Sequence, residues 1–294
     1  MDRKRPYFSI IIPTYNRPQQ LERCLKSLAQ LTYPRDRFEV IVVNDGGERP
    51  LPNEIEKISA NVNLQIITQP NQGPATARNT GASAAKGALL AFTDDDCSPA
   101  PDWLDCLAAG VGEETAVAVG GRTINAFPEN AFSTASQLLI AYLYAYYNQN
   151  SGTFFTSNNL AVPKKLFLEV GGFDTNMPLA AGEDREFCDR WRHLGFSLRF
   201  IPDAIVRHWH WLTAVSFWRQ HFNYGRGAWQ YHQIRAKRQQ MSLKVEPFSF
   251  YLNLIRFPFS QQRFLPAVIH AKLLGMAQVA NAAGFFWERG KNGR

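Results

Sequence analysis

The sequence lacks paired cysteines and long apolar runs. Its four cysteines, Cys24, Cys97, Cys106 and Cys188, form no C-x-x-C pair and have no zinc-binding spacing with histidine, which favours reduced thiols in the cytoplasm. No uninterrupted stretch of about 18 apolar residues occurs, so no membrane-spanning helix is predicted. The apolar run near the start is short and contains Pro13, which predicts a buried strand and not a signal peptide.

Acidic residues are scarce toward the C-terminal end. Residues 205–294 contain 13 of the 32 Lys and Arg, 17 of the 38 aromatic residues, and only 2 of the 25 Asp and Glu. Such a segment is typical of a basic solvated appendage, of a helical lid over a cleft, or of a surface that meets anionic lipid headgroups or a phosphate-bearing acceptor. We expect a cytoplasmic protein with peripheral contact at the inner face of the cell membrane. No nucleic-acid-binding motif is present, and no nucleic acid partner is expected.

The first hundred residues alternate strand and helix patterns. Four apolar runs end in polar residues, FSIIIPTYN, FEVIVVNDGG, NLQIITQ and ALLAFTDDD, and helices are predicted from Pro18 and over residues 74–85. This alternation predicts an α/β fold with a parallel sheet and right-handed crossovers. Ligands of such sheets bind at the carboxyl ends of the strands, so we expect residues 13–17, 44–46 and 94–96 to lie along one edge.

Beyond Pro101 the pattern is less regular. Helices are predicted at PDWLDCLAAG, over residues 131–147 and at GEDREFCDRWRHLG, and strands at VAVGGRTIN, FFTSNNLAV and FSLRFIP. We expect Pro202 to end the last of these strands, because proline cannot donate to a strand ladder. After about Thr213 the chain is expected to be helical.

Three adjacent carboxylates, Asp94, Asp95 and Asp96, follow an apolar strand. Burying such charges unpaired is costly, and a divalent cation such as Mg²⁺ or Mn²⁺ would relieve the repulsion while leaving positions for substrate phosphates. The alternative is a solvated acidic turn that caps the next helix. The strand-end position favours the metal.

Two other groups have the residue types of a catalytic site. Glu183 and Asp184 begin a predicted helix, where they are either helix-capping residues or a general base that accepts the proton of an attacking hydroxyl. His208 and His210 alternate on one face of an extended segment. Each is either a structural histidine or a neutral imidazole ligand that completes a metal site.

These segments together resemble a known family. The order SIIIPTYNRP, EVIVVNDGG, GPATARNTGASAAKG, LLAFTDDD and GEDREFCDRWRHLG is similar to that of the family-2 inverting glycosyltransferases, which have the GT-A fold, over about residues 8–210. The resemblance implies a nucleotide-binding half in residues 1–100, an acceptor half in residues 101–212 and a helical extension in residues 213–294. It implies that the nucleotide sugar is bound by Pro13, Thr14, Tyr15, Arg17, Asn44, Asp45, Arg78, Asp94 and Asp95.

The resemblance also implies the chemical roles. Asp96 would be the main ligand of a divalent cation, Mn²⁺ or Mg²⁺, with Asp94 and His208 as further contacts and His210 as the substitute for His208. Asp184 would be the catalytic base, with Glu183 beside it.

The sequence departs from the family pattern at three positions. Asn44 stands where the family has an aspartate, and Gly47 where it has a serine. Phe187 replaces the glutamine of the processive members' Q-x-x-R-W motif, which argues against a polymer-extruding synthase.

The expected activity is inverting transfer of a hexosyl unit from a nucleotide diphosphate sugar, with a UDP-sugar favoured. The acceptor would be a hydroxyl of a saccharide or a lipid-linked molecule, in surface polysaccharide or glycolipid synthesis. A sugar-phosphate nucleotidyltransferase would need a glycine-rich phosphate loop after the first strand, and SIIIPTYNRP has no glycine. A non-catalytic carbohydrate-binding or scaffold protein would not need both acidic groups.

Overall fold

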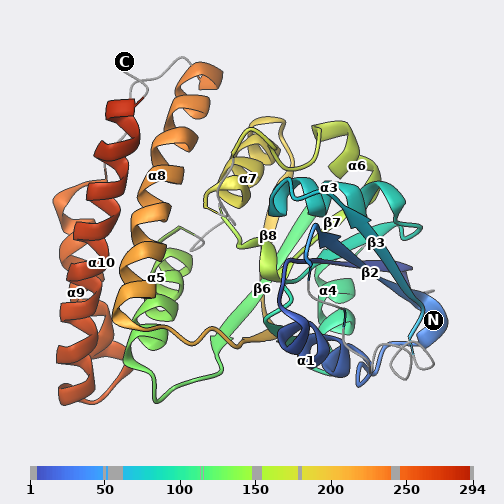
Figure 1. Cartoon of the computed structure of the whole chain (residues 1–294), viewed down its shortest axis with the longest axis horizontal. Helices are drawn as coiled ribbons and strands as arrows, with labels where there is room; N and C mark the ends of the chain where they lie inside the picture. Colours follow the sequence, from blue (N-terminus) through green and yellow to red (C-terminus); the bar gives the residue numbers. More distant parts are fainter. Residues whose placement is uncertain are drawn as a thin grey trace.

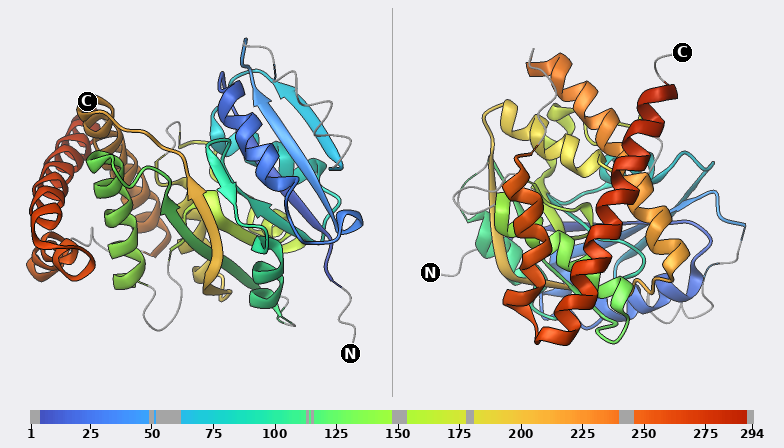
Figure 2. Two further views of the ribbon diagram at one scale, coloured as in Figure 1. Left: turned by 90° about the horizontal axis from the view of Figure 1, so that it is seen from below. Right: turned by 90° about the vertical axis from the view of Figure 1, so that its left-hand side faces the viewer.

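The structure is a computed structural model and describes residues 5–48, 51, 62–112, 114, 116–147, 154–177, 181–239 and 246–291. An eight-stranded sheet forms the centre, with helices on both faces, and a layer of long helices stands beside it (Figure 1). The two further views in Figure 2 show that this helical layer covers one side of the sheet domain.

The strands are β1 (Phe8–Thr14), β2 (Phe38–Asp45), β3 (Leu64–Gln69), β4 (Leu89–Phe92), β5 (Cys97–Pro99), β6 (Val117–Asn125), β7 (Leu160–Pro163) and β8 (Ser197–His208). Their order in the sheet is β3-β2-β1-β4-β7-β6-β8-β5. The first four strands pair in parallel, as the strand and helix alternation predicted, and β7 pairs antiparallel with β4 and β6. Parallel pairing brings the ends of β1, β2 and β4 to one edge.

The helices that cover the sheet are α1 (Pro18–Leu28), α3 (Pro74–Ala84), α4 (Trp103–Val111), α5 (Ala131–Tyr147), α6 (Lys164–Val170) and α7 (Glu183–His193), with short 3₁₀ turns at Arg35–Arg37 and Ser157–Asn159. Helices α1 and α4 bury their apolar side chains against one face of the sheet. Helices α3, α6 and α7 pack on the other face, with part of α5. Each covering helix therefore buries an apolar stripe, which is what holds it to the sheet.

The expectation that Pro202 ends its strand is wrong, because β8 continues to His208. The register between β6 and β8 shifts at this point: Gly121 pairs with Ile201, but the next residue, Arg122, pairs with Ile205. Pro202 lies in the resulting bulge, where its missing N–H costs no ladder hydrogen bond. The continued strand carries His208 to a position opposite Cys97 of β5, directly after the acidic triplet.

A second strand is shorter than expected. The segment FFTSNNLAV becomes strand only at Leu160, because Ser157–Asn159 form a 3₁₀ turn. Asn159 in this turn is fully buried, accepts a hydrogen bond from Trp103 Nε1 (2.8 Å) and donates one to the carbonyl of Ala204 (2.8 Å). These long-range bonds hold the turn in place and are not visible as a local pattern.

The C-terminal helices are α8 (Ala214–Gln239), α9 (Phe248–Gln261) and α10 (Phe264–Lys291), so the helical expectation after Thr213 is confirmed. Helices α8 and α10 pack so closely that a side chain at Gly225 would collide with the carbonyl oxygen of Asn281. Residues of α5, α9 and α10 share a separate apolar cluster that includes Leu139, Phe250 and Leu274. Across the described ranges, no helix combines the length and hydropathy needed to cross a bilayer.

Candidate active site

A large cavity lies at the edge where β1, β2 and β4 end. Its volume is about 1360 Å³, and it is bounded by this edge, by the start of α7 and by α5, α8, α9 and α10. The residues predicted from the sequence that line it are Pro13, Thr14, Tyr15, Arg17, Asp45, Arg78, Asp94, Asp95, Asp96, Glu183, Asp184 and His208. The fold therefore brings together segments that are far apart in the chain.

Asn44 is the predicted residue that does not line this cavity. Its side chain is buried and accepts a hydrogen bond from the backbone N–H of Gly47 (3.0 Å). It therefore shapes the turn after β2, and its contact with a nucleotide stays a prediction.

The Asp45 carboxylate is held rigidly by three donors. It accepts hydrogen bonds from Gln69 Nε2 (2.7 Å) and from the backbone N–H groups of Gln72 (3.0 Å) and Gly73 (2.8 Å). Since Gly73 immediately precedes α3, Asp45 ties the end of β2 to the start of that helix. This arrangement pre-positions the loop that borders the cavity.

The three carboxylates of the triplet have different partners. Asp94 accepts a charged hydrogen bond from Arg78 Nη2 (2.7 Å), and Asp95 accepts one from Thr14 Oγ1 (2.7 Å). Arg17 Nη1 lies 3.3 Å from Asp95 and 3.2 Å from Asp96. Burial, and then the charge of Asp96, raise the pKa of Asp95 to about 7. Asp95 is thus a buried link between β1 and the triplet, whereas Asp94 and Asp96 face other charged groups.

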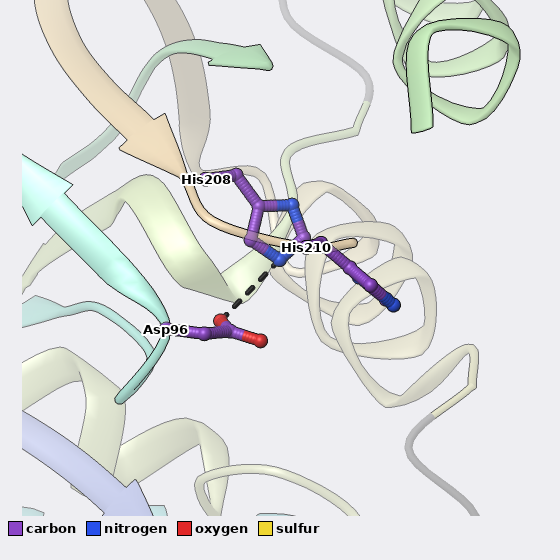
Figure 3. A group of neighbouring side chains, drawn as sticks. All are labelled: Asp96, His208 and His210. Carbon is purple, nitrogen blue, oxygen red and sulfur yellow. Dashed lines mark ion pairs between the residues drawn. The ribbon is translucent and has the colours of Figure 1, made fainter. Parts of the chain in front are cut away.

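Asp96 forms a candidate metal group with His208, the last residue of β8, and with His210, which follows that strand (Figure 3). One ligand atom from each of Asp96, His208 and His210 lies within 4.8 Å of the others, and His208 Nε2 is 3.3 Å from Asp96 Oδ1. The backbone N–H of Trp209 donates to the carbonyl of Asp96 (2.8 Å) and fixes the two segments together.

In this group, burial would lower the pKa of His208, but the adjacent Asp96 raises it above its usual value, so a bound metal would displace a proton from this imidazole. Burial alone would raise the pKa of Asp96, but the adjacent His208 holds it below its usual range. Burial and His208 lower the pKa of His210 to about 4, so its imidazole is neutral and able to coordinate. One carboxylate with two imidazoles is a donor set that fits Mn²⁺ or another divalent ion and leaves positions for phosphate oxygens. Asp94 lies outside this group, since its carboxylate is held by Arg78.

Arg78 connects the triplet to the beginning of α7. Its guanidinium is almost completely buried and donates to Asp94 and, through Nη1, to Glu183 Oε1 (3.1 Å). Within the described part of the chain, Arg78 Nε and Glu183 Oε2 are buried without a hydrogen-bond partner. Both residues line the cavity. Buried polar atoms normally have partners, so these two atoms are exceptions within the site.

Glu183 and Asp184 are adjacent carboxylates at the start of α7. Burial and the charge of Asp184 raise the pKa of Glu183 to about 7, although Arg78 opposes this. Burial also raises the pKa of Asp184, while the backbone N–H of Arg185, whose distance to Asp184 Oδ1 is 2.8 Å, opposes the rise. The residue before the helix, Gly182, makes no side-chain cap. A carboxylate with a raised pKa in a cleft has the properties of a general base.

Helix α8 contacts both α7 and the segment that precedes it. Arg238 of α8 pairs with Glu186 and with Asp189 (2.9 Å), both on α7. A side chain at Gly227 of α8 would collide with the carbonyl oxygen of Ala181, so α8 packs directly on the segment that leads into Glu183. The position of α7 thus depends on α8.

The residues that form the far side of the cavity were not predicted from the sequence. Among them are Arg185, Tyr231, His232 and Arg235, together with apolar residues of α5, α9 and α10. The concentration of aromatic and basic residues after position 204 was the available signal, but it did not indicate which of them face the sheet. His210 was considered only as a substitute for His208, whereas the structure brings both to Asp96.

Sequence comparisons with known proteins identify the family of this chain. The sequence profile of Glycosyl transferase family 2 matches residues 9–173. Glycosyltransferase AglE of Haloferax volcanii is 31% identical over 211 residues, which cover 69% of this chain and 67% of that protein. The probable glycosyltransferase YdaM of Bacillus subtilis is 28% identical over 276 residues, which cover 90% of this chain and 64% of YdaM. The chain thus spans about two thirds of the length of these relatives.

Solved structures show the same fold. The mannosyltransferase PcManGT from Pyrobaculum calidifontis, in complex with GDP-Man and Mn²⁺, superimposes with a TM-score of 0.69 at 20% identity, covering 98% of this chain and 89% of that one. S. aureus TarS 1–349 in complex with UDP-GlcNAc gives a TM-score of 0.60 at 17% identity, covering 97% and 91%. With the family profile matching more than half of its length, the chain belongs to glycosyltransferase family 2 and has the GT-A fold.

Proposed function

We propose that this protein transfers a sugar from a nucleoside diphosphate sugar to an acceptor hydroxyl with inversion at the anomeric carbon. The observation that carries the proposal is one cavity that contains both the Asp96, His208 and His210 group and the Glu183–Asp184 pair, linked by Arg78. PcManGT was solved with GDP-Man and TarS with UDP-GlcNAc. The family resemblance favours a hexosyl unit carried by UDP, for surface polysaccharide or glycolipid synthesis.

In the proposed mechanism the chain's residues bind, orient and accept a proton. Thr14, Arg17 and Asp45 border the nucleotide end of the cavity, and Asp184 takes the proton of the acceptor hydroxyl. The hydroxyl oxygen then bonds to the anomeric carbon from the face opposite the bond that breaks, and the nucleoside diphosphate leaves with that electron pair. A divalent cation held by Asp96, His208 and His210 would supply positive charge to offset the charge on the diphosphate.

A thermal-shift panel of nucleotide sugars, each with and without Mn²⁺, tests the proposal. A ligand at 100 times its Kd stabilises the native state by about 2.7 kcal/mol, so its melting temperature should rise by several degrees. We expect the rise with UDP-sugars and expect it to require Mn²⁺. GDP-Man and a free sugar serve as comparisons. No shift with any nucleotide sugar, in the presence or absence of Mn²⁺, would reject the proposal.

We also propose peripheral contact with an anionic membrane through α9 and α10. Large apolar side chains are exposed near the corner between these helices, namely Phe259, Phe264, Leu265 and Ile269. Residues 247–287 contain no Asp or Glu, while Arg256, Arg263 and Lys272 are exposed among them. Exposed apolar groups with cations and without carboxylates favour an interface with anionic lipid.

Flotation with vesicles tests this contact. We expect the protein to float with vesicles rich in phosphatidylglycerol at low salt, and to float less with neutral phosphatidylcholine vesicles or at high salt. The double variant Phe264→Glu with Leu265→Glu should lose most of the binding. The matched control is Leu194→Glu, at an exposed apolar position at the end of α7. Equal flotation of wild type and double variant would contradict the assignment of this surface.

A further inference from the structure

The cavity is larger and more apolar than a nucleotide sugar requires. Its volume of about 1360 Å³ exceeds the roughly 300–1,000 Å³ of a typical small-molecule site, so it has room for the acceptor as well as the donor. The wall away from the strand ends is formed by apolar side chains, including Leu139 and Leu143 of α5, Phe250 of α9 and Phe285 of α10. The base of a nucleoside diphosphate sugar can stack on an aromatic side chain, but the rest of the molecule is polar and would not cover this wall.

Arg185 stands between this apolar wall and the catalytic pair. Its guanidinium lies over three aromatic rings, 5.8 Å from the ring centre of Tyr147, 5.6 Å from that of Phe154 and 5.2 Å from that of Tyr231. Among the described residues no carboxylate forms an ion pair with it, whereas Arg235 and Arg238 are both paired with Asp189. Aromatic faces hold and orient a cation but do not neutralise it. Within the ranges that the structure describes, Arg185 is therefore a cation of the cavity that is held in place by aromatic rings and has no ion-pair partner.

Other charged side chains line the cavity with Arg185. They are the cations Arg192, Arg235 and Arg289 and the carboxylates Asp184, Asp189 and Glu246, of which Asp189 is paired with Arg235 and Arg238. Burial, followed by the charges of Arg185 and Arg235, lowers the pKa of His232 to about 4, so this imidazole stays neutral. A partly desolvated guanidinium that has no ion-pair partner binds an anion, and it suits a phosphate best.

The apolar wall continues to the surface. Val279 and Phe286 of α10 line the cavity and are also 61% and 63% exposed. The cavity therefore reaches the protein surface at α10, which gives a chain that lies along the wall a way out. This opening is on the same helix whose other end has the exposed Phe264 and Leu265.

We propose that the acceptor is an anionic amphiphile, with its phosphate at Arg185 and its hydrocarbon chain along the wall of α5, α9 and α10. Arg185 and Asp184 are adjacent in the chain and both line the cavity, which places a hydroxyl near that phosphate in the same space as the proposed base. This inference names the acceptor class of the proposed transferase and rests on that function. Its test needs no turnover.

Decyl phosphate below its micelle concentration is the probe. Its Kd, measured by titration calorimetry, is compared with those of inorganic phosphate, which has the anion alone, and decyl glucoside, which has the chain and a neutral head. We expect decyl phosphate to bind at least tenfold more tightly than either. If decyl glucoside binds as tightly as decyl phosphate, the role proposed for Arg185 is contradicted. If inorganic phosphate binds as tightly as decyl phosphate, the role proposed for the apolar wall is contradicted.

Two variants assign the binding to these residues. Arg185→Gln should weaken decyl phosphate binding at least tenfold and leave decyl glucoside binding unchanged, while Arg185→Lys should retain more affinity for decyl phosphate than Arg185→Gln, because the charge is kept. Val279→Asp should weaken both alkyl probes. The matched controls are Arg122→Gln and Leu168→Asp, which change an exposed cation and an exposed apolar residue outside the cavity. Equal loss in variant and control would overturn the proposal.

The Mn²⁺-dependent thermal shift with a UDP-sugar is measured on each variant as well. A retained shift shows that the variant is folded and that its donor site is intact. If the wild type gives that shift but has no preference for decyl phosphate, the acceptor inference fails and the proposed function stands. If the wild type gives no shift, the proposed function fails independently of the probe.

Discussion

Asp184→Asn is expected to lower kcat for sugar transfer by about 10²–10⁴-fold, the usual contribution of a general base. The amide cannot accept the hydroxyl proton, but it has nearly the shape of the carboxylate. Donor binding depends on groups at the strand ends, so the Kd of the nucleotide sugar should change by less than about threefold, which is the scatter expected for a site whose contacts are intact. Single-turnover kinetics together with donor titration separate the two quantities.

The pH dependence of the reaction is the second readout for this variant. Since burial raises the pKa of both carboxylates, with that of Glu183 at about 7, the pair is protonated over a wider range of acid pH than free carboxyls. In the wild type, kcat/KM should therefore fall as the pH decreases through the raised pKa of Asp184, and the residual rate of Asp184→Asn should lack this part of the pH dependence. Asp203→Asn, at an exposed carboxylate of β8, is the control. A variant with near-normal kcat would show that Asp184 is not the base.

Asp96→Asn is expected to remove most of the Mn²⁺-dependent part of donor binding. Even the loss of a residue that only orients a metal ligand costs about 10–100-fold in metal affinity, and the loss of a direct carboxylate ligand should cost at least as much. The measurement is the affinity for UDP with and without Mn²⁺, together with the electron paramagnetic resonance signal of free Mn²⁺. In the absence of metal, wild type and variant should bind UDP similarly.

Asp95→Asn separates this effect from general damage to the triplet. The Asp95 side chain bonds to Thr14 and Arg17 and lies outside the Asp96, His208 and His210 group. We therefore expect Asp95→Asn to lower the free energy of unfolding and to retain the Mn²⁺ dependence of UDP binding. If both variants lose that response equally, the assignment of Asp96 as the principal ligand is wrong.

The elements that follow from local patterns were predictable from the sequence. Helix α1 was recognised from Pro18 and the apolar spacing of Leu21, Leu25 and Leu28, and the strand-end position of the triplet from the buried run before it. These features depend on hydrophobic periods of 3.6 and 2 residues, which a single sequence contains.

Features that depend on distant partners were not predictable. The course of β8 past Pro202 follows from a bulge against β6, and no property of Pro202 itself indicates which strand will lie beside it. The division of the triplet into a residue that pairs with Arg78, a buried link to Thr14 and a partner of His208 is likewise a result of tertiary packing. Arg185 shows no local sign of its three aromatic neighbours, since they come from α5, α8 and the segment before β7.

The close packing of Gly227 on Ala181 has a consequence for protein engineering. Because α8 is in direct contact with the segment that leads into the carboxylate pair, the C-terminal helices are not an interchangeable module. A chimera that takes these helices from a relative also takes the relative's α8 surface, against which the segment at Ala181 packs. Acceptor preference and catalytic geometry should therefore be inherited together, and an exchange boundary placed before residue 181 would preserve this contact better than one at residue 212.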